Sequence, residues 1–145
     1  MTQLTHLLNT QLILMDKSRS KLIESMSQCE KVNLDQLLND KDEIIFEALT
    51  ARFSRLSDFL IQKIFRTLDA IDLEDTGTVR DRINRAEKKA WIDSADDFIK
   101  IRTMRNIIAH EYSEAEVLEI YKNVLKLAPV LLKTCINIKK YVHTV

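Results

Sequence analysis

Residues 40–71 read DKDEIIFEALTARFSRLSDFLIQKIFRTLDAI, and this stretch decides the fold. Apolar side chains recur in it every three or four residues, which is the spacing of one face of an α-helix. The residues of this face are Ile45, Leu49, Phe53, Leu56, Leu60, Ile64 and Leu68. Asp40, followed three residues later by Glu43, predicts the start of the helix. Phe46, Phe59 and other apolar residues widen the face, so we expect burial on two sides, at the centre of a bundle or in a subunit interface.

The remainder of the chain predicts further helices with the same apolar spacing. We expect helices over Thr2–Cys29, Thr78–Lys89 and Ser94–His110, a helical turn over Asp35–Asn39, and a last helix that begins at the cap of Ser113. Pro129 lies inside the last helix and should kink or split it, and the tail Lys139–Val145 should fray. The sequence therefore predicts an all-α fold, an antiparallel four-helix-type bundle with an extra short helix, as one domain over residues 1–145.

The composition narrows the class of protein. One Gly and one Pro in 145 residues favour long helices joined by few loops. The 22 basic and 22 acidic residues balance, so any contact with nucleic acid must come from a local patch. No apolar run approaches the roughly 20 residues that span a bilayer, and the first residues lack the basic segment of a secretory signal. We expect a cytoplasmic protein without membrane contact.

The two cysteines, Cys29 and Cys135, are far apart and fall on apolar helical stripes. Neither has a Cys or His partner at the spacing of metal ligands, so buried thiols are the favoured interpretation. We expect no metal site and no cofactor.

The stretch from Arg102 to Tyr112 carries the chemistry. Lys100, Arg102 and Arg105 place three cations within six residues, and His110 follows where the helix should end. An arginine can bind phosphate oxygens in pairs and stabilise the charge of a transition state. Histidine titrates near neutral pH, so it can accept a proton from a ribose 2′-hydroxyl or donate one to the leaving 5′-oxygen.

These residue types suit cleavage of an RNA phosphodiester, with Asn106 as an additional hydrogen-bond donor. Efficient transesterification needs both an acid and a base, and one chain offers a single suitable histidine, His110. A two-fold dimer would bring two copies of Arg105 and His110 together, so an enzyme of this type predicts a homodimer. The alternative is structural, since arginine and histidine near the end of a helix also suit the negative end of its dipole.

The predicted short helix is locally basic, with Arg80, Arg82 and Arg85 on it. A solvated charged face is one interpretation of this pattern. The other is an electrostatic surface that guides a phosphate backbone, together with Lys100, toward the motif.

The segment Arg105-Asn106-Ile107-Ile108-Ala109-His110-Glu111-Tyr112 resembles the R-x4-6-H motif of HEPN domains. It matches the stricter form R-x4-H-x-Y of HepT-like toxins at Arg105, His110 and Tyr112, and a polar residue after the arginine, here Asn106, is also usual there. The motif lies near the end of a long helix and before a final one, as in that family.

This resemblance implies a HEPN-like helical bundle that dimerises and cuts RNA without a metal. It implies the toxin of a type VII-like pair whose antitoxin is an MNT-type nucleotidyltransferase. Arg105 and His110 would be catalytic, with Asn106 and Arg102 in support, and Tyr112 would be a site of control by AMPylation. Two alternatives stay open: a non-catalytic nucleotide- or substrate-binding partner of a nucleotidyltransferase, and a plain dimeric helical scaffold.

Overall fold

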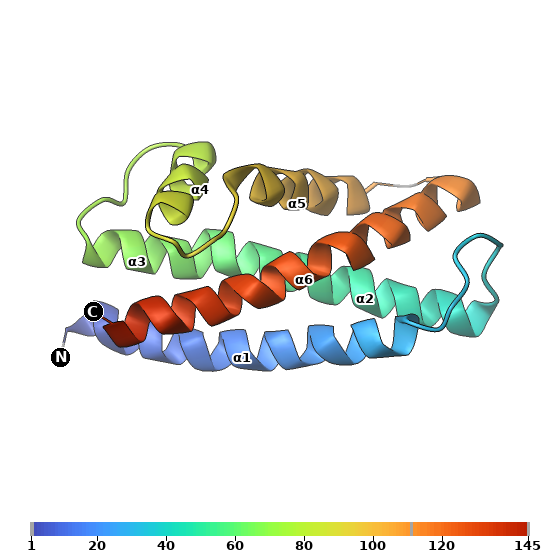
Figure 1. Cartoon of the computed structure of the whole chain (residues 1–145), viewed down its shortest axis with the longest axis horizontal. Coiled ribbons are helices and arrows are strands. Elements are labelled where there is room, and N and C mark those ends of the chain that lie inside the picture. Colours follow the sequence, from blue (N-terminus) through green and yellow to red (C-terminus); the bar gives the residue numbers. More distant parts are fainter. Residues whose placement is uncertain (1, 111, 145) are drawn as a thin grey trace.

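The computed structural model describes residues 2–110 and 112–144, and every regular element in them is helical (Figure 1). The elements are α1 (Gln3–Cys29), α2 (Asp40–Phe59), the π-helical segment η1 (Leu60–Ile64), α3 (Phe65–Ile71), α4 (Val79–Lys88), α5 (Ala95–Ile108) and α6 (Glu114–Thr144). The all-α prediction is confirmed. None of these helices within the described residues combines the length and apolar composition that crossing a bilayer requires.

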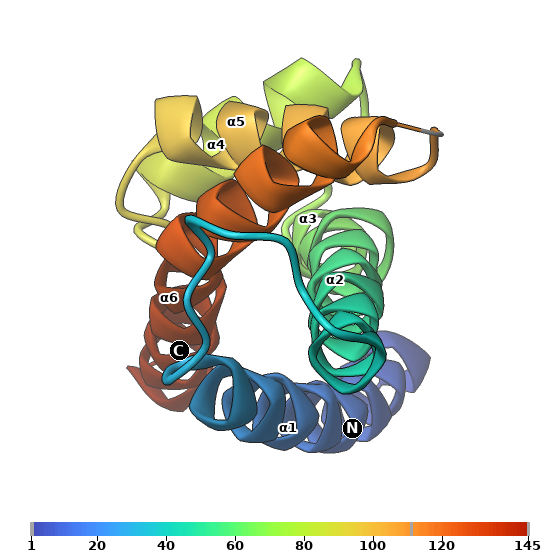
Figure 2. The same ribbon diagram turned by 90° about the vertical axis from the view of Figure 1, so that its right-hand side faces the viewer.

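Four long rods surround one core. Helices α2, η1 and α3 follow one another as a continuous rod, and consecutive rods run in opposite directions (Figure 1). Viewed along its length in Figure 2, the bundle has α1, α2, α5 and α6 around its centre. Helix α4 packs at one end, against α3, η1 and α5. This arrangement confirms the predicted antiparallel bundle with an extra short helix.

Residues 40–71 lie at the centre of the bundle. Phe46, Phe53, Leu60 and Phe65 have no exposed surface, and α2 contacts α1, α5 and α6. The two-sided burial predicted for residues 40–71 is therefore supplied within a single chain. Cys29 and Cys135 are buried free thiols, as predicted, and burial raises their pKa values to about 11 and about 12.

Several local predictions were wrong. Asp35–Asn39 does not form a helical turn, and the cap of α2 is Asn39, whose side chain accepts a hydrogen bond from the Asp42 amide at 2.8 Å. Of the two outcomes predicted for Pro129, a kink or a split, only the split is wrong, because α6 continues through this residue. Its path does change direction along its length, as Figure 2 shows.

The tail does not fray over residues 139–144, which belong to α6; Val145 lies outside the described residues. Tertiary contacts order this end of the helix. The Tyr141 ring packs edge-on against Trp91 at 5.5 Å between centroids, and its hydroxyl donates a hydrogen bond to Asp72 at 3.2 Å. Trp91 is fully buried, so the last turns of α6 cover part of the core.

Candidate functional site

Part of the predicted site lies in an open groove of about 440 Å³ between the rod of α2 and η1 and helix α5. Its walls carry two cations, one acid, two amides and a hydroxyl. The lining residues are Ser57, Asp58, Ile61, Gln62, Arg102, Arg105 and Asn106. Helix α5 supplies the arginines and Asn106, all within its last two turns. The structure thus brings three of the predicted residues to one surface.

Arg105 is held by a residue that the sequence analysis did not identify. Its Nε donates to both carboxylate oxygens of Asp58, at 2.8 and 3.0 Å. The hydrogen bond to Asp58, and then the charge of that carboxylate, raise the pKa of Arg105. Both side chains are partly exposed, 34% for Arg105 and 43% for Asp58, so a ligand in the groove can reach them.

His110 lies beyond the end of α5. The helix ends at Ile108 with Ala109 as its C-terminal cap, and the His110 amide donates to the carbonyl of Ile107 at 3.0 Å. The side chain is exposed, as expected for a group that meets a substrate. His110 is not among the described residues that line the Arg105 groove.

Tyr112 lies at a different hollow. It is half-buried and lines a pocket of about 170 Å³ beside the start of α6, together with Leu38, Glu43 and Tyr121. The three motif residues therefore occupy separate places within one chain. Arg105 is in the groove, His110 is exposed after the helix, and Tyr112 is in the second pocket.

Lys100 faces away from Arg102. It lines another groove, of about 410 Å³ between α5 and α6, with Asp97 and Lys126. Residues two apart on a helix point to nearly opposite sides, which explains the separation. The predicted cluster of three cations is thus divided between two surfaces.

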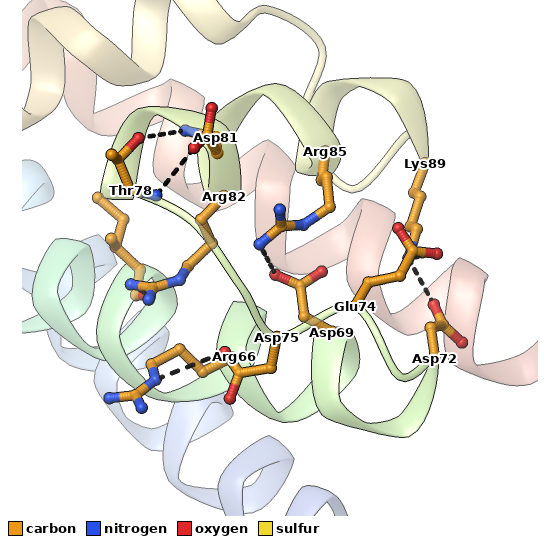
Figure 3. A network of polar contacts seen from close by, with 11 residues as sticks. Arg66, Asp69, Asp72, Glu74, Asp75, Thr78, Asp81, Arg82, Arg85 and Lys89 are labelled. Carbon is orange, nitrogen blue, oxygen red and sulfur yellow. Dashed lines mark hydrogen bonds and ion pairs between the residues drawn. The ribbon is translucent and has the colours of Figure 1, made fainter.

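Arg85 of α4, and Lys89 directly after this helix, turn toward acids of α3 and the loop that follows it (Figure 3). Arg85 forms an ion pair with the fully buried Asp69 at 3.0 Å, and Lys89 pairs with Asp72 at 2.7 Å. Arg82 is half-buried and donates to the Ile61 carbonyl at 3.3 Å.

These contacts divide the predicted approach residues into two groups. Arg80 and Lys100 are exposed and available to a polyanion. Arg82 and Arg85 hold α4 onto the rod, and Asp69 offsets the charge of Arg85. Guidance of RNA by these residues stays a prediction.

The π-helical segment forms part of the groove wall. The Phe65 amide bonds to the carbonyl of Leu60, five residues earlier, where an α-helix would bond four residues earlier. Ile61 and Gln62 belong to this wider turn and line the groove, three and four residues after Asp58. Such single wide turns occur often at functional sites.

The described residues hold no group of three or more His, Cys, Asp or Glu side chains placed to bind a metal.

Comparison of the chain with models of known protein families, with curated proteins and with solved structures gave no match.

Proposed function

We propose that this chain is a metal-independent RNA endonuclease that acts as a homodimer, and that it is the toxin of a HEPN/MNT toxin–antitoxin pair. The observation that carries the proposal is the groove that holds Arg102, Arg105 and Asn106 at the end of α5, immediately before the exposed His110. The motif Arg105-x4-His110-x-Tyr112, in an all-helical bundle, supports the same assignment.

In this proposal Arg105 binds a non-bridging phosphate oxygen and stabilises the charge that grows in the transition state. Arg102 and Asn106 assist it from the adjacent turns of α5. His110 transfers the proton, as base toward the 2′-hydroxyl or as acid toward the leaving 5′-oxygen. A second copy of the chain supplies the partner His110, since one histidine cannot take both roles in the same step.

Tyr112 is the proposed point of control by an MNT-type nucleotidyltransferase antitoxin. An AMP group on its hydroxyl would add bulk and negative charge two residues from His110. A phosphate placed there would repel the phosphates of RNA near His110. The half-buried ring beside a pocket at the start of α6 is compatible with this role and with a purely structural one.

The test compares growth arrest and RNA cleavage in EDTA for the wild type, His110→Ala and Arg105→Ala. Removal of a general acid or base should lower cleavage by about 100-fold or more. His6→Ala is the matched control, because His6 is also exposed but lies in the first turns of α1. Folded His110→Ala and Arg105→Ala proteins that retain wild-type cleavage would overturn the proposal.

One observation favours a second candidate, a non-catalytic nucleotide-binding partner of a nucleotidyltransferase. Asp58 offsets part of the charge of Arg105 in the free chain, which reduces the electrostatic stabilisation that this arginine could give to a transition state. This candidate predicts a tight complex with the transferase and no RNA cleavage by the free protein. Cleavage in EDTA that His110→Ala abolishes would exclude it.

A further inference from the structure

We propose that Asp58 is a positioning residue for Arg105: it holds the Nε side of the guanidinium and leaves the two Nη groups to grip a phosphodiester in the groove. This inference rests on the proposed function, and it deepens it by naming the group that sets the direction of the phosphate-binding arginine. It assigns to the groove one bound phosphodiester unit of single-stranded RNA.

The geometry of the ion pair is the first argument. A guanidinium has five N–H donors, one on Nε and four on the two Nη atoms. Both oxygens of Asp58 accept from Nε alone, at 2.8 and 3.0 Å. Within the described part of the chain, neither Nη atom has a hydrogen-bond partner. The end of the guanidinium that binds phosphate in pairs therefore stays open, while its Nε side is fixed.

The charge of the groove is the second argument. Arg102 and Arg105 contribute two positive charges and Asp58 one negative charge, which leaves a single positive charge in the groove. A phosphodiester carries one negative charge and would neutralise it. The amides of Asn106 and Gln62 can donate hydrogen bonds to the remaining oxygens.

The setting of Asp58 is the third argument. It lies in the last turn of α2, next to Ser57 and close to Leu56 and Leu60, all of which are buried. Arg82 also donates to the carbonyl of Ile61 in the adjoining π-helical turn. A carboxylate on such a rigid element can fix a partner side chain far better than one on a loop.

The first experiment compares kcat and KM for RNA cleavage by the wild type, Asp58→Ala and Asp58→Asn. Asp58→Ala should lower kcat by about 10- to 100-fold, because a small misplacement of a catalytic group is costly. It should leave KM unchanged or lower, because the groove gains positive charge. Asp58→Asn keeps an oxygen that can accept from Nε, so it should recover part of the lost kcat.

Asp16→Ala is the matched control. Asp16 forms an ion pair with Lys139 at 2.8 Å, and its side chain is 45% exposed, close to the 43% of Asp58. It joins α1 to α6, away from the groove, so its loss should leave both kcat and KM unchanged. A folded Asp58→Ala protein with kcat within twofold of the wild type would overturn the inference and leave the proposed function standing.

The second experiment does not depend on cleavage. Arginine side-chain NMR follows Arg105 while a 2′-O-methyl hexanucleotide, which cannot undergo transesterification, is added. We expect the Nη signals of Arg105 to shift and its Nε–H signal to stay protected in the wild type but not in Asp58→Ala. Loss of that protection in the wild type on binding, or no change at Arg105, would refute the positioning role. The expected shifts in a protein that cuts no RNA would refute the proposed catalysis alone.

Discussion

Arg85→Met should greatly lower the free energy of unfolding, although Arg85 lies on a helix whose sequence suggests a basic surface. Among the described residues, Arg85 is the only side chain that donates a hydrogen bond to the Asp69 carboxylate, at 3.0 Å. Asp69 has no exposed side-chain surface, and its Oδ1 has no hydrogen-bond partner among the described residues. The substitution therefore leaves an uncompensated charge in the interior.

Removal of one partner from a buried ion pair costs about 3–5 kcal/mol. Arg85 is 19% exposed, so water reaches its side of the pair and the lower limit applies. A loss of about 3 kcal/mol lowers the folding equilibrium constant by roughly 100-fold. It should lower the melting temperature by about 6–12 °C in a chain of this length. Methionine keeps much of the apolar stem, so lost packing adds little.

Urea unfolding followed by circular dichroism measures this loss. Arg80→Met, an exposed arginine on the same helix, is the control and should change the unfolding free energy by less than about 0.5 kcal/mol. The double variant Asp69→Leu/Arg85→Met should recover much of the stability, because an apolar pair replaces the buried charges. If Arg85→Met stays as stable as Arg80→Met but binds RNA more weakly, then Arg85 guides RNA and the structural role is refuted.

Three further outcomes follow from the structure. Burial raises the pKa of Cys29 to about 11 and of Cys135 to about 12, from 9.0, so both thiols stay protonated in the folded chain while they ionise in the unfolded one. Their contribution to stability is complete below pH 9 and is lost as pH rises toward the pKa values of the folded chain, by about 1 kcal/mol per thiol at pH 10. Urea unfolding at a series of pH values should show that the free energy of unfolding of Cys135→Ala falls less steeply with pH than that of the wild type. An equally steep fall in the two proteins would contradict the assignment. Gly77→Ala should cost about 1–2 kcal/mol or more, because Gly77 has φ +92° and a Cβ there would lie 2.5 Å from Asp81 Oδ2, within the cap of α4; thermal melts check this. Ala90→Gly should raise the melting temperature by a few degrees, because Ala90 has φ +63°; a decrease would show that its methyl group matters more than its backbone.

Local signals in the sequence predicted most of the fold. Thr78 and Asp81 form a capping box at the predicted start of α4, and Ser94, the predicted start of the next helix, caps α5 by accepting from the Asp97 amide. Such caps involve residues three apart, so a short stretch of sequence is enough to predict them. Apolar periodicity located the long rods for the same reason, since each face repeats within a turn.

The contacts that shape the groove could not be predicted in this way. Asp58 and Arg105 are 47 residues apart, and nothing in the spacing of either one points to the other. The inward direction of Arg85 depends on how α4 packs on α3, because a charged helix face looks the same in sequence whether solvent or an acid meets it. The order of the last turns of α6 has a similar origin, in the contact of Tyr141 with Trp91.

The wide turn of η1 sets the angular phase of the rod. Asp58 and Asp69 are eleven residues apart, and in a regular α-helix they would lie within about 20° of each other around the axis. One added residue in a π-helical turn delays the later part by about 100°, so the two carboxylates diverge by about 80°. A single rod thereby offers one acid to Arg105 of α5 and another to Arg85 of α4. If the same eleven-residue spacing were regular α-helix without the wide turn, the two acids would lie on the same side, and the rod could satisfy one of its two arginines only by turning away from the other.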